Sequence, residues 1–241
     1  MLPPGWRLEV HAALPSTSDR IAAAAEAGEP AGLAVLALEQ TAGRGRSGRA
    51  WSSPPGNLYC SMLLRPGGPA REAAQWSLLA GVALAEAAAE IDPEPAALRL
   101  KWPNDLLRHG AKCAGILAES ALDPEGRLAW LSLGIGVNLA HAPALPDHRT
   151  TCLGAAEPPD TFAARLIGRL DHWAHRHAVE GFGPIRVAWL ALGPPPGTPI
   201  TLREGPVEGG LFAGLAEDGA LLLERDGALH SIRSGEIHRL G

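Results

Sequence analysis

Residues 106–139 read LLRHGAKCAGILAESALDPEGRLAWLSLGIGVNL, and this segment predicts strands joined into pairs by tight turns. A histidine-glycine step at 109–110 marks the first turn, and DPEG at 123–126 marks the second. Gly134 and Gly136 interrupt the last strand, and glycine inside a strand indicates close approach by a backbone or a ligand. The segment therefore predicts sheet structure built from hairpins, with a close contact on its last strand.

The residues before this segment alternate between helical and strand patterns. Residues 16–28 begin with hydroxyl residues that can cap a helix, continue with an alanine-rich run and end in glycine, which predicts a helix. A continuous apolar run at 32–39 predicts a buried strand, and NLYCSMLLR at 57–65 predicts a second strand. Residues 71–91 have helical composition and periodicity, and LRLKW at 98–102 predicts a short strand.

The residues after the segment predict helices and then a change of character. Residues 160–180 and 182–192 look helical, and GPPPG at 193–197 punctuates the chain. Short alternating segments separated by turns then predict a small all-β unit. We therefore expect a mixed α/β fold, with one domain over residues 1–192 and a small β domain over residues 193–241.

The composition fits a folded protein of one large domain, or one domain with a small appendage. Of the 241 residues, 46% are hydrophobic and 20% are charged, which allows a substantial core. The net charge of −5 gives no global basic field, which counts against a protein that coats nucleic acid. The three cysteines are dispersed, and neither a signal peptide nor a membrane span is predicted, so we expect a cytoplasmic protein.

Lysine is rare in this chain. Of 21 basic residues, only Lys101 and Lys112 are lysines. Against an arginine-rich background, a retained lysine indicates a need for a compact ammonium group with rotatable donors. Two lysines could also survive by chance, but both fall within the motifs described next.

The loop QTAGRGRSGRAW, residues 40–51, concentrates glycine and arginine after a predicted buried strand. Its glycines let the backbone approach a ligand closely, and Arg44, Arg46 and Arg49 can direct guanidinium groups onto phosphate or carboxylate oxygens. The loop matches neither the P-loop nor the Rossmann glycine pattern. Taken alone, it fits three interpretations: closure over a ligand, contact with RNA, or a solvated surface.

Three further segments carry reactive or polar groups. KWPNDLL at 101–107 presents a cation, an amide and a carboxylate at a strand end, where they can hold triphosphate, base or metal-bound water. GAKCAGILAES at 110–120 places Lys112 among small or apolar neighbours, and GIGVNL at 134–139 ends with Asn138. Ordinary turn formation and core packing are the alternatives for these segments.

Together, GRGRSGRAW, KWPNDLL, AKCAGILAE and GIGVNL, in this order, resemble the biotin protein ligases. The resemblance implies a mixed sheet flanked by helices, as in class II synthetases, followed by a small SH3-like β-barrel. It also implies that biotin and ATP, with Mg²⁺, form biotinyl-5′-AMP. Biotin then passes to a lysine of a biotin carboxyl carrier domain, which is the expected partner.

The resemblance also assigns site residues by position, with Arg46 and Lys112 as the catalytic pair. The expected biotin-binding residues are Ser16, Thr17, Ser18, Gln40, Arg44, Gly45, Arg46, Lys112 and Gly115. The expected ATP- and adenylate-binding residues are Arg46, Arg49, Trp51, Lys101, Asn104, Asp105 and Asn138. Ser18 departs from the family, which usually has Asn at that position. No metal ligands are assigned.

Several alternatives compete with this interpretation. The first ligand motif begins at residue 16, so no helix-turn-helix domain is expected before it, and we expect a ligase without DNA or membrane binding. A homodimer remains open. A lipoate ligase would share the fold but leave the glycine-arginine loop unexplained, and an RNA-binding module conflicts with the acidic net charge. Three histidines within 172–177 predict a helix surface instead of a metal site.

Overall fold

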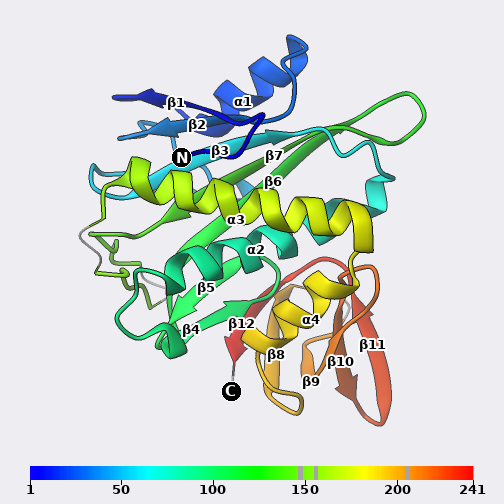
Figure 1. Ribbon diagram of the computed structural model, residues 1–241. Helices are drawn as coiled ribbons and strands as arrows, with labels where there is room; N and C mark the ends of the chain where they lie inside the picture. The colour runs from blue at the N-terminus through cyan, green and yellow to red at the C-terminus, as the bar shows by residue number, and fades with distance from the viewer. Residues whose placement is uncertain (146–148, 155–156, 205–206, 241) are drawn as a thin grey trace.

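A mixed β-sheet forms the centre of the molecule (Figure 1). The computed structural model describes residues 1–145, 149–154, 157–204 and 207–240. The strands of this sheet are β1 (Arg7–His11), β2 (Leu33–Ala37), β3 (Leu58–Leu64), β4 (Leu98–Lys101), β5 (Asp105–Arg108), β6 (Ala111–Leu122) and β7 (Leu128–Val137). They lie in the order β1-β2-β3-β7-β6-β5-β4. Strands β1 and β2 are parallel, and the other neighbouring pairs are antiparallel.

Both turns predicted between residues 106 and 139 are confirmed. Strands β5 and β6 are joined by His109 and Gly110, whose φ angles are 49° and 72°. Positive φ at both central positions defines a type I′ turn, whose twist matches that of the flanking strands. Residues 123–127 then connect β6 to β7, and Gly126 takes a φ of 76° there. The long β6–β7 hairpin that results is the middle of the sheet.

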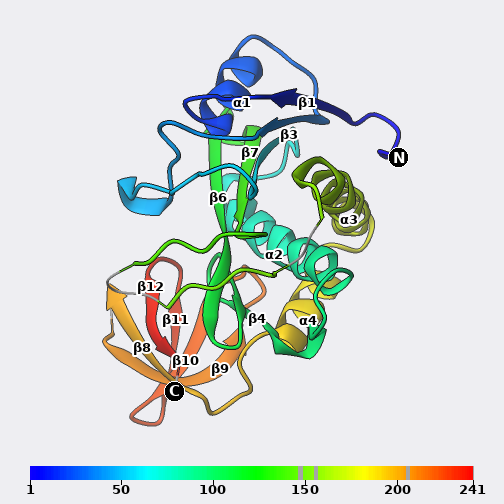
Figure 2. The ribbon, with the colours of Figure 1, turned by 90° about the vertical axis from the view of Figure 1, so that its left-hand side faces the viewer.

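Helices cover the two faces of the sheet unequally (Figure 2). They are α1 (Thr17–Glu26), α2 (Ala73–Ala89), α3 (Pro159–Glu180) and α4 (Gly183–Leu192). Alternate residues of β2 separate the faces, because Leu33 and Val35 pack with Ile21 of α1 while Ala34 and Leu36 join the larger core with α2 and α3. The face shared with α1 is therefore left partly uncovered beyond the end of this short helix.

The C-terminal residues form a second, antiparallel sheet beside α4 (Figure 1). Its strands are β8 (Pro199–Glu204), β9 (Gly209–Leu215), β10 (Leu221–Arg225), β11 (Ala228–Ile232) and β12 (Glu236–Leu240), in the order β11-β10-β9-β8-β12. Phe212 of this sheet packs against Trp189 of α4, and Trp102 donates a hydrogen bond to the Gly219 carbonyl at 3.2 Å. A single hydrophobic core thus includes residues of both sheets. The domain division at residue 193 stays a prediction.

The predicted helices and strands of residues 16–192 are confirmed to within about two residues at each end. Strand β1 was not predicted, because Arg7–His11 is a half-exposed edge strand with little apolar character. In the part of the chain that the structure describes, none of the helices combines the length and apolar character that a membrane span requires.

Candidate active site

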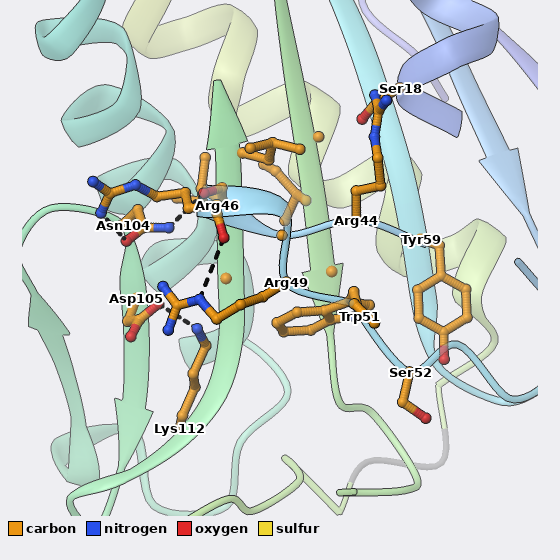
Figure 3. Close-up of a pocket in the computed structure, with 18 of the residues that line it drawn as sticks. Ser18, Arg44, Arg46, Arg49, Trp51, Ser52, Tyr59, Asn104, Asp105 and Lys112 are labelled. Atoms are coloured by element: carbon orange, nitrogen blue, oxygen red, sulfur yellow. Dashed lines mark hydrogen bonds and ion pairs between the residues drawn. The ribbon is translucent and has the colours of Figure 1, made fainter. Parts of the chain in front are cut away.

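A cavity of about 350 Å³ opens on the α1 side of the central sheet. Figure 3 shows Ser18 and Arg44 at one end of it and Asn104, Asp105 and Lys112 at the other. The expected site residues that line it are Ser16, Thr17, Ser18, Gln40, Arg44, Gly45, Arg46, Arg49, Trp51, Asn104, Asp105, Lys112, Gly115 and Asn138. Lys101 is the expected residue that does not line this cavity.

The floor of the cavity is made by glycines of β7. Gly134 and Gly136 face the cavity, because the alternate residues Ile135 and Val137 belong to the core on the opposite face. A Cβ atom on Gly136 would lie 2.6 Å from Nε1 of Trp51, well inside contact distance. A close approach does occur at both glycines, but side chains make it, the Trp51 indole at Gly136 and the Ser18 hydroxyl at Gly134, and not the backbone or ligand that was predicted. The bare glycines leave the floor low enough for the Trp51 indole to lie across it.

Buried hydroxyl groups gather at the α1 end of the cavity. Ser16 occupies the N-cap position of α1 but makes no side-chain capping bond, so the predicted capping by hydroxyls is wrong in this detail. The hydroxyls of Thr17 and Ser18 instead contact the Ser61 hydroxyl of β3, at 2.8 and 3.2 Å. Gln40 accepts hydrogen bonds from the backbone N–H and the hydroxyl of Thr17. This end of the cavity is thus a preformed polar pocket.

The glycine-arginine loop is tied to the body of the protein at this same end. Arg44 lies 2.7 Å from Asp19 of α1 and 3.3 Å from Glu119 of β6. All three side chains are partly exposed, so each pair contributes little to stability on its own. Their combined effect is to hold the loop against two separate elements across the cavity mouth.

The same loop also contacts the C-terminal sheet. Arg46 donates hydrogen bonds to Oδ1 of Asn104 at 3.2 Å and to the carbonyl of Gly235 at 3.3 Å. Arg49 pairs with Glu236 at 2.9 Å. The amide of Asn104 is itself oriented, because its Nδ2 donates to the carbonyl of Ile116 at 2.7 Å. The start of β12 therefore closes the cavity at the end where two arginines converge.

Asp105 lies between the two lysines of the chain. Its Oδ1 is 2.6 Å from Nζ of Lys112, and its Oδ2 is 3.7 Å from Nζ of Lys101. Burial lowers the pKa of Lys101, and the carboxylate of Asp105 opposes that shift. Lys112 also lies 5.4 Å from the centroid of the Trp51 ring. The cavity therefore contains one ammonium group held by a carboxylate, with the second ammonium behind it.

Some residues that line the cavity were not predicted from the sequence. Arg203 and Glu236 line the cavity from the C-terminal sheet, and no local pattern links them to residues more than a hundred positions earlier. Tyr59 also lines it, and Ser61 lies behind Thr17 and Ser18. The sequence did contain a clue to Ser61, since it is a polar residue within the otherwise apolar strand β3.

The histidines of α3 do not form a metal centre in the described residues. Within the ranges that the structure covers, no three His, Cys, Asp or Glu side chains are grouped to hold a metal ion. The exposed helix surface expected for all three histidines is wrong for His177, which is partly buried and packs against Trp76 with tilted rings whose centroids are 5.0 Å apart. Burial accordingly lowers the pKa of His177.

The fold and the cavity together define an enzyme site, in which several cations converge on a space that can hold an anionic ligand. The Biotin/lipoate A/B protein ligase family model matches residues 12–138, and the Biotin protein ligase C terminal domain model matches residues 197–239. This chain belongs to the biotin/lipoate protein ligase family.

Individual relatives agree with this assignment. A biotin–[acetyl-CoA-carboxylase] ligase of Paracoccus denitrificans is 41% identical, over 84% of this chain and 88% of its own length. The bifunctional ligase/repressor BirA of Bacillus subtilis is 33% identical, over 97% of this chain and 74% of its own. The structure of the Aquifex aeolicus biotin protein ligase in complex with biotin and ATP superimposes with a TM-score of 0.79 at 27% identity, covering 96% of this chain and 97% of that one.

Proposed function

We propose that this protein activates biotin with ATP to form biotinyl-5′-AMP and then transfers biotin to a lysine of a biotin carboxyl carrier domain. The observation that carries the proposal is one cavity with a polar hydroxyl pocket at one end and converging cations at the other. The Paracoccus relative is named as a ligase that acts on acetyl-CoA carboxylase, and the Aquifex structure holds biotin and ATP.

In the first half-reaction the biotin carboxylate attacks the α-phosphorus of ATP. A bond forms between a carboxylate oxygen and phosphorus, and the bond from that phosphorus to the pyrophosphate oxygen breaks. Both reactants are anions, so the main requirement is positive charge placed in advance where they meet. Lys112 of β6 and Arg46 of the loop supply that charge at one end of the cavity, beside Asp105 and Asn104.

The nucleotide belongs at the end of the cavity next to the C-terminal sheet. Arg49, Asn104 and Asn138 offer donors there, and the Trp51 indole offers a flat apolar surface. Mg²⁺ bound to ATP would neutralise phosphate charge, and carboxylates such as Asp105 are the ligands that this ion accepts alongside phosphates and water. Asp105 could fulfil that role only by sharing its charge between Mg²⁺ and Lys112.

In the second half-reaction the neutral amine of the acceptor lysine attacks the acyl carbon of the adenylate. A C–N bond forms, the bond from the acyl carbon to the phosphate oxygen breaks, AMP leaves with both electrons of that bond, and the nitrogen loses one proton to solvent. Because the adenylate is prone to hydrolysis, water must be kept out until the acceptor arrives. We assign this task to the glycine-arginine loop, which Arg44 ties to α1 and β6 and Arg46 ties to the residue before β12.

Biotin-dependent exchange of pyrophosphate into ATP tests the first half-reaction, and transfer to an added carrier domain tests the second. Lipoate in place of biotin tests the alternative substrate on the same fold. Exchange supported by lipoate and not by biotin would overturn the proposal. We further propose that the reaction takes place in the cytoplasm, where ATP and carboxylases meet, while a homodimer stays a prediction.

A further inference from the structure

A directed chain of hydrogen bonds lies behind the hydroxyl end of the cavity. Ser18 contacts Ser61 at 3.2 Å, and Ser61 contacts Thr17 at 2.8 Å, oxygen to oxygen. The Thr17 hydroxyl lies 3.1 Å from Oε1 of Gln40. Ser61 is fully buried in β3, and the chain passes through it. Each hydroxyl has a single proton to donate, so the direction of one bond determines the next.

Backbone groups settle the direction of this chain. The Thr17 backbone N–H can only donate, and it lies 2.8 Å from Gln40, so the amide atom facing it must be the acceptor Oε1. The Thr17 hydroxyl must then donate to Oε1, since two acceptors that close would repel. At the far side of the amide, Nε2 donates to Ser53, whose hydroxyl donates to the carbonyl of Trp51 at 3.0 Å. A carbonyl can only accept, so both ends agree.

The remaining protons follow from this direction. Thr17 has given its proton to Gln40, so it accepts the proton of Ser61. Ser61 has then given its proton away, so it accepts the proton of Ser18. The Ser18 hydroxyl is left with its lone pairs as its only remaining hydrogen-bonding capacity. Ser18 lines the cavity, above the bare Cα of Gly134.

We propose that Ser61 is a positioning residue that fixes the Ser18 hydroxyl as a hydrogen-bond acceptor for a ureido N–H of biotin. The inference rests on the proposed function and adds the polarity of one contact within the site. Ser18 stands where the family usually has Asn, whose amide can donate or accept by turning over. A serine hydroxyl acts only as an acceptor towards a ligand when its proton is already donated elsewhere, and here the Ser18 proton is donated to Ser61.

The test compares biotin with two analogues, each a cyclic carbamate in which a ring oxygen replaces one ureido N–H. For one of the two isomers, two acceptors would face each other at Ser18. The wild-type enzyme should therefore use that isomer about a hundredfold less efficiently than biotin in pyrophosphate exchange. The quantity measured is the ratio of the efficiency with biotin to the efficiency with that isomer. In Ser61→Ala the Ser18 proton is free to turn towards the ring oxygen of the analogue, so this ratio should fall about tenfold from its wild-type value.

Two matched variants separate positioning from loss of structure. Ser61→Thr keeps the hydroxyl and should keep the wild-type ratio. Ser132→Ala, on the neighbouring strand β7, removes another buried hydroxyl, which has no partner among the described residues, and should leave the ratio unchanged. General destabilisation would lower the efficiency with biotin and with the analogue together and would not move their ratio.

The outcomes also distinguish this inference from the proposed function. If the wild-type enzyme is active and Ser61→Ala has the same biotin-to-analogue ratio, the inference is overturned and the proposed function stands. The same holds if Ser61→Thr lowers the ratio as much as Ser61→Ala does. If Ser61→Ala does not fold, Ser18→Ala gives the same test, because removing the acceptor should also lower the ratio at least tenfold. A folded wild-type protein without biotin-dependent exchange overturns the proposed function and the inference with it.

Discussion

The two floor glycines of the cavity should control different substrates, although they lie only two residues apart. In Gly136→Ala the new Cβ would lie 2.6 Å from Trp51, so the indole must move by about 0.8 Å to reach ordinary contact at 3.4 Å. In Gly134→Ala the new Cβ would lie 2.7 Å from the Ser18 hydroxyl, which requires a shift of about 0.7 Å. Misplacements near 1 Å in a site can cost on the order of a hundredfold in rate.

We therefore expect Gly136→Ala to raise KM for ATP with little change for biotin, and Gly134→Ala to raise KM for biotin with little change for ATP. Each should lower the efficiency of pyrophosphate exchange by roughly tenfold to a hundredfold. The assay is exchange measured over a matrix of biotin and ATP concentrations, with thermal unfolding recorded for each variant.

Gly168→Ala in α3 is the matched control for these substitutions. A Cβ there meets nothing within 4 Å, and alanine is favoured over glycine in a helix by about 1 kcal/mol. This control should keep both KM values and raise Tm slightly. If the two cavity variants raised the same KM, the assignment of the two ends to different substrates would be refuted.

Three other perturbations test the site and the core. Lys112→Arg should lower the rate of the first half-reaction by about a hundredfold or more, because a bulkier planar guanidinium does not fit where the compact ammonium lies between Asp105 and the Trp51 ring; near-normal exchange would contradict this. Arg46→Ala should keep Tm within a few degrees and release more free adenylate, measured by chromatography of the reaction supernatant, and retention equal to wild type would count against the lid. Burial raises the pKa of Cys60 and Cys113 to about 12, so at pH 8 a thiol reagent should label Cys152 first and the other two only on unfolding; rapid labelling of all three would disprove the packing.

Local pattern was enough to predict the elements that build the floor of the site. The turn at 109–110 and the glycines of β7 each have a backbone requirement that their residue types reveal. A continuous apolar run revealed β2, and NLYCSMLLR revealed β3, because both faces of these strands are buried and their residues are therefore mostly apolar. Each of these features depends on a few neighbouring residues, which is the range over which sequence pattern is informative.

The features that depend on distant contacts were not predictable in this way. Glu236 pairs with Arg49, which lies 187 positions earlier in the sequence, and no local pattern around either residue indicates its partner. Lys101 was assigned to the nucleotide side by resemblance, and that assignment stays a prediction; in the structure Lys101 lies directly opposite Asp105 in the β4–β5 pair, on the same face of the sheet but outside the cavity lining. Strand β1 is recognisable only once β2 is there to pair with it.

The pairing of both lysines with Asp105 has a chemical consequence for a protein that would make an amine-reactive acyl-adenylate. The chain has two lysines; Lys101 is 9% exposed, and the ammonium of Lys112 is held by the carboxylate. An amine that is buried, like that of Lys101, or held in an ion pair, like that of Lys112, is a poor nucleophile towards adenylate in solution, and arginine does not replace lysine as a nucleophile, because guanidinium groups stay protonated. The surface can therefore carry its cations as arginine without offering lysine amines to stray adenylate. An acceptor lysine that docks at the cavity then meets little competition from the catalyst that activates its acyl group.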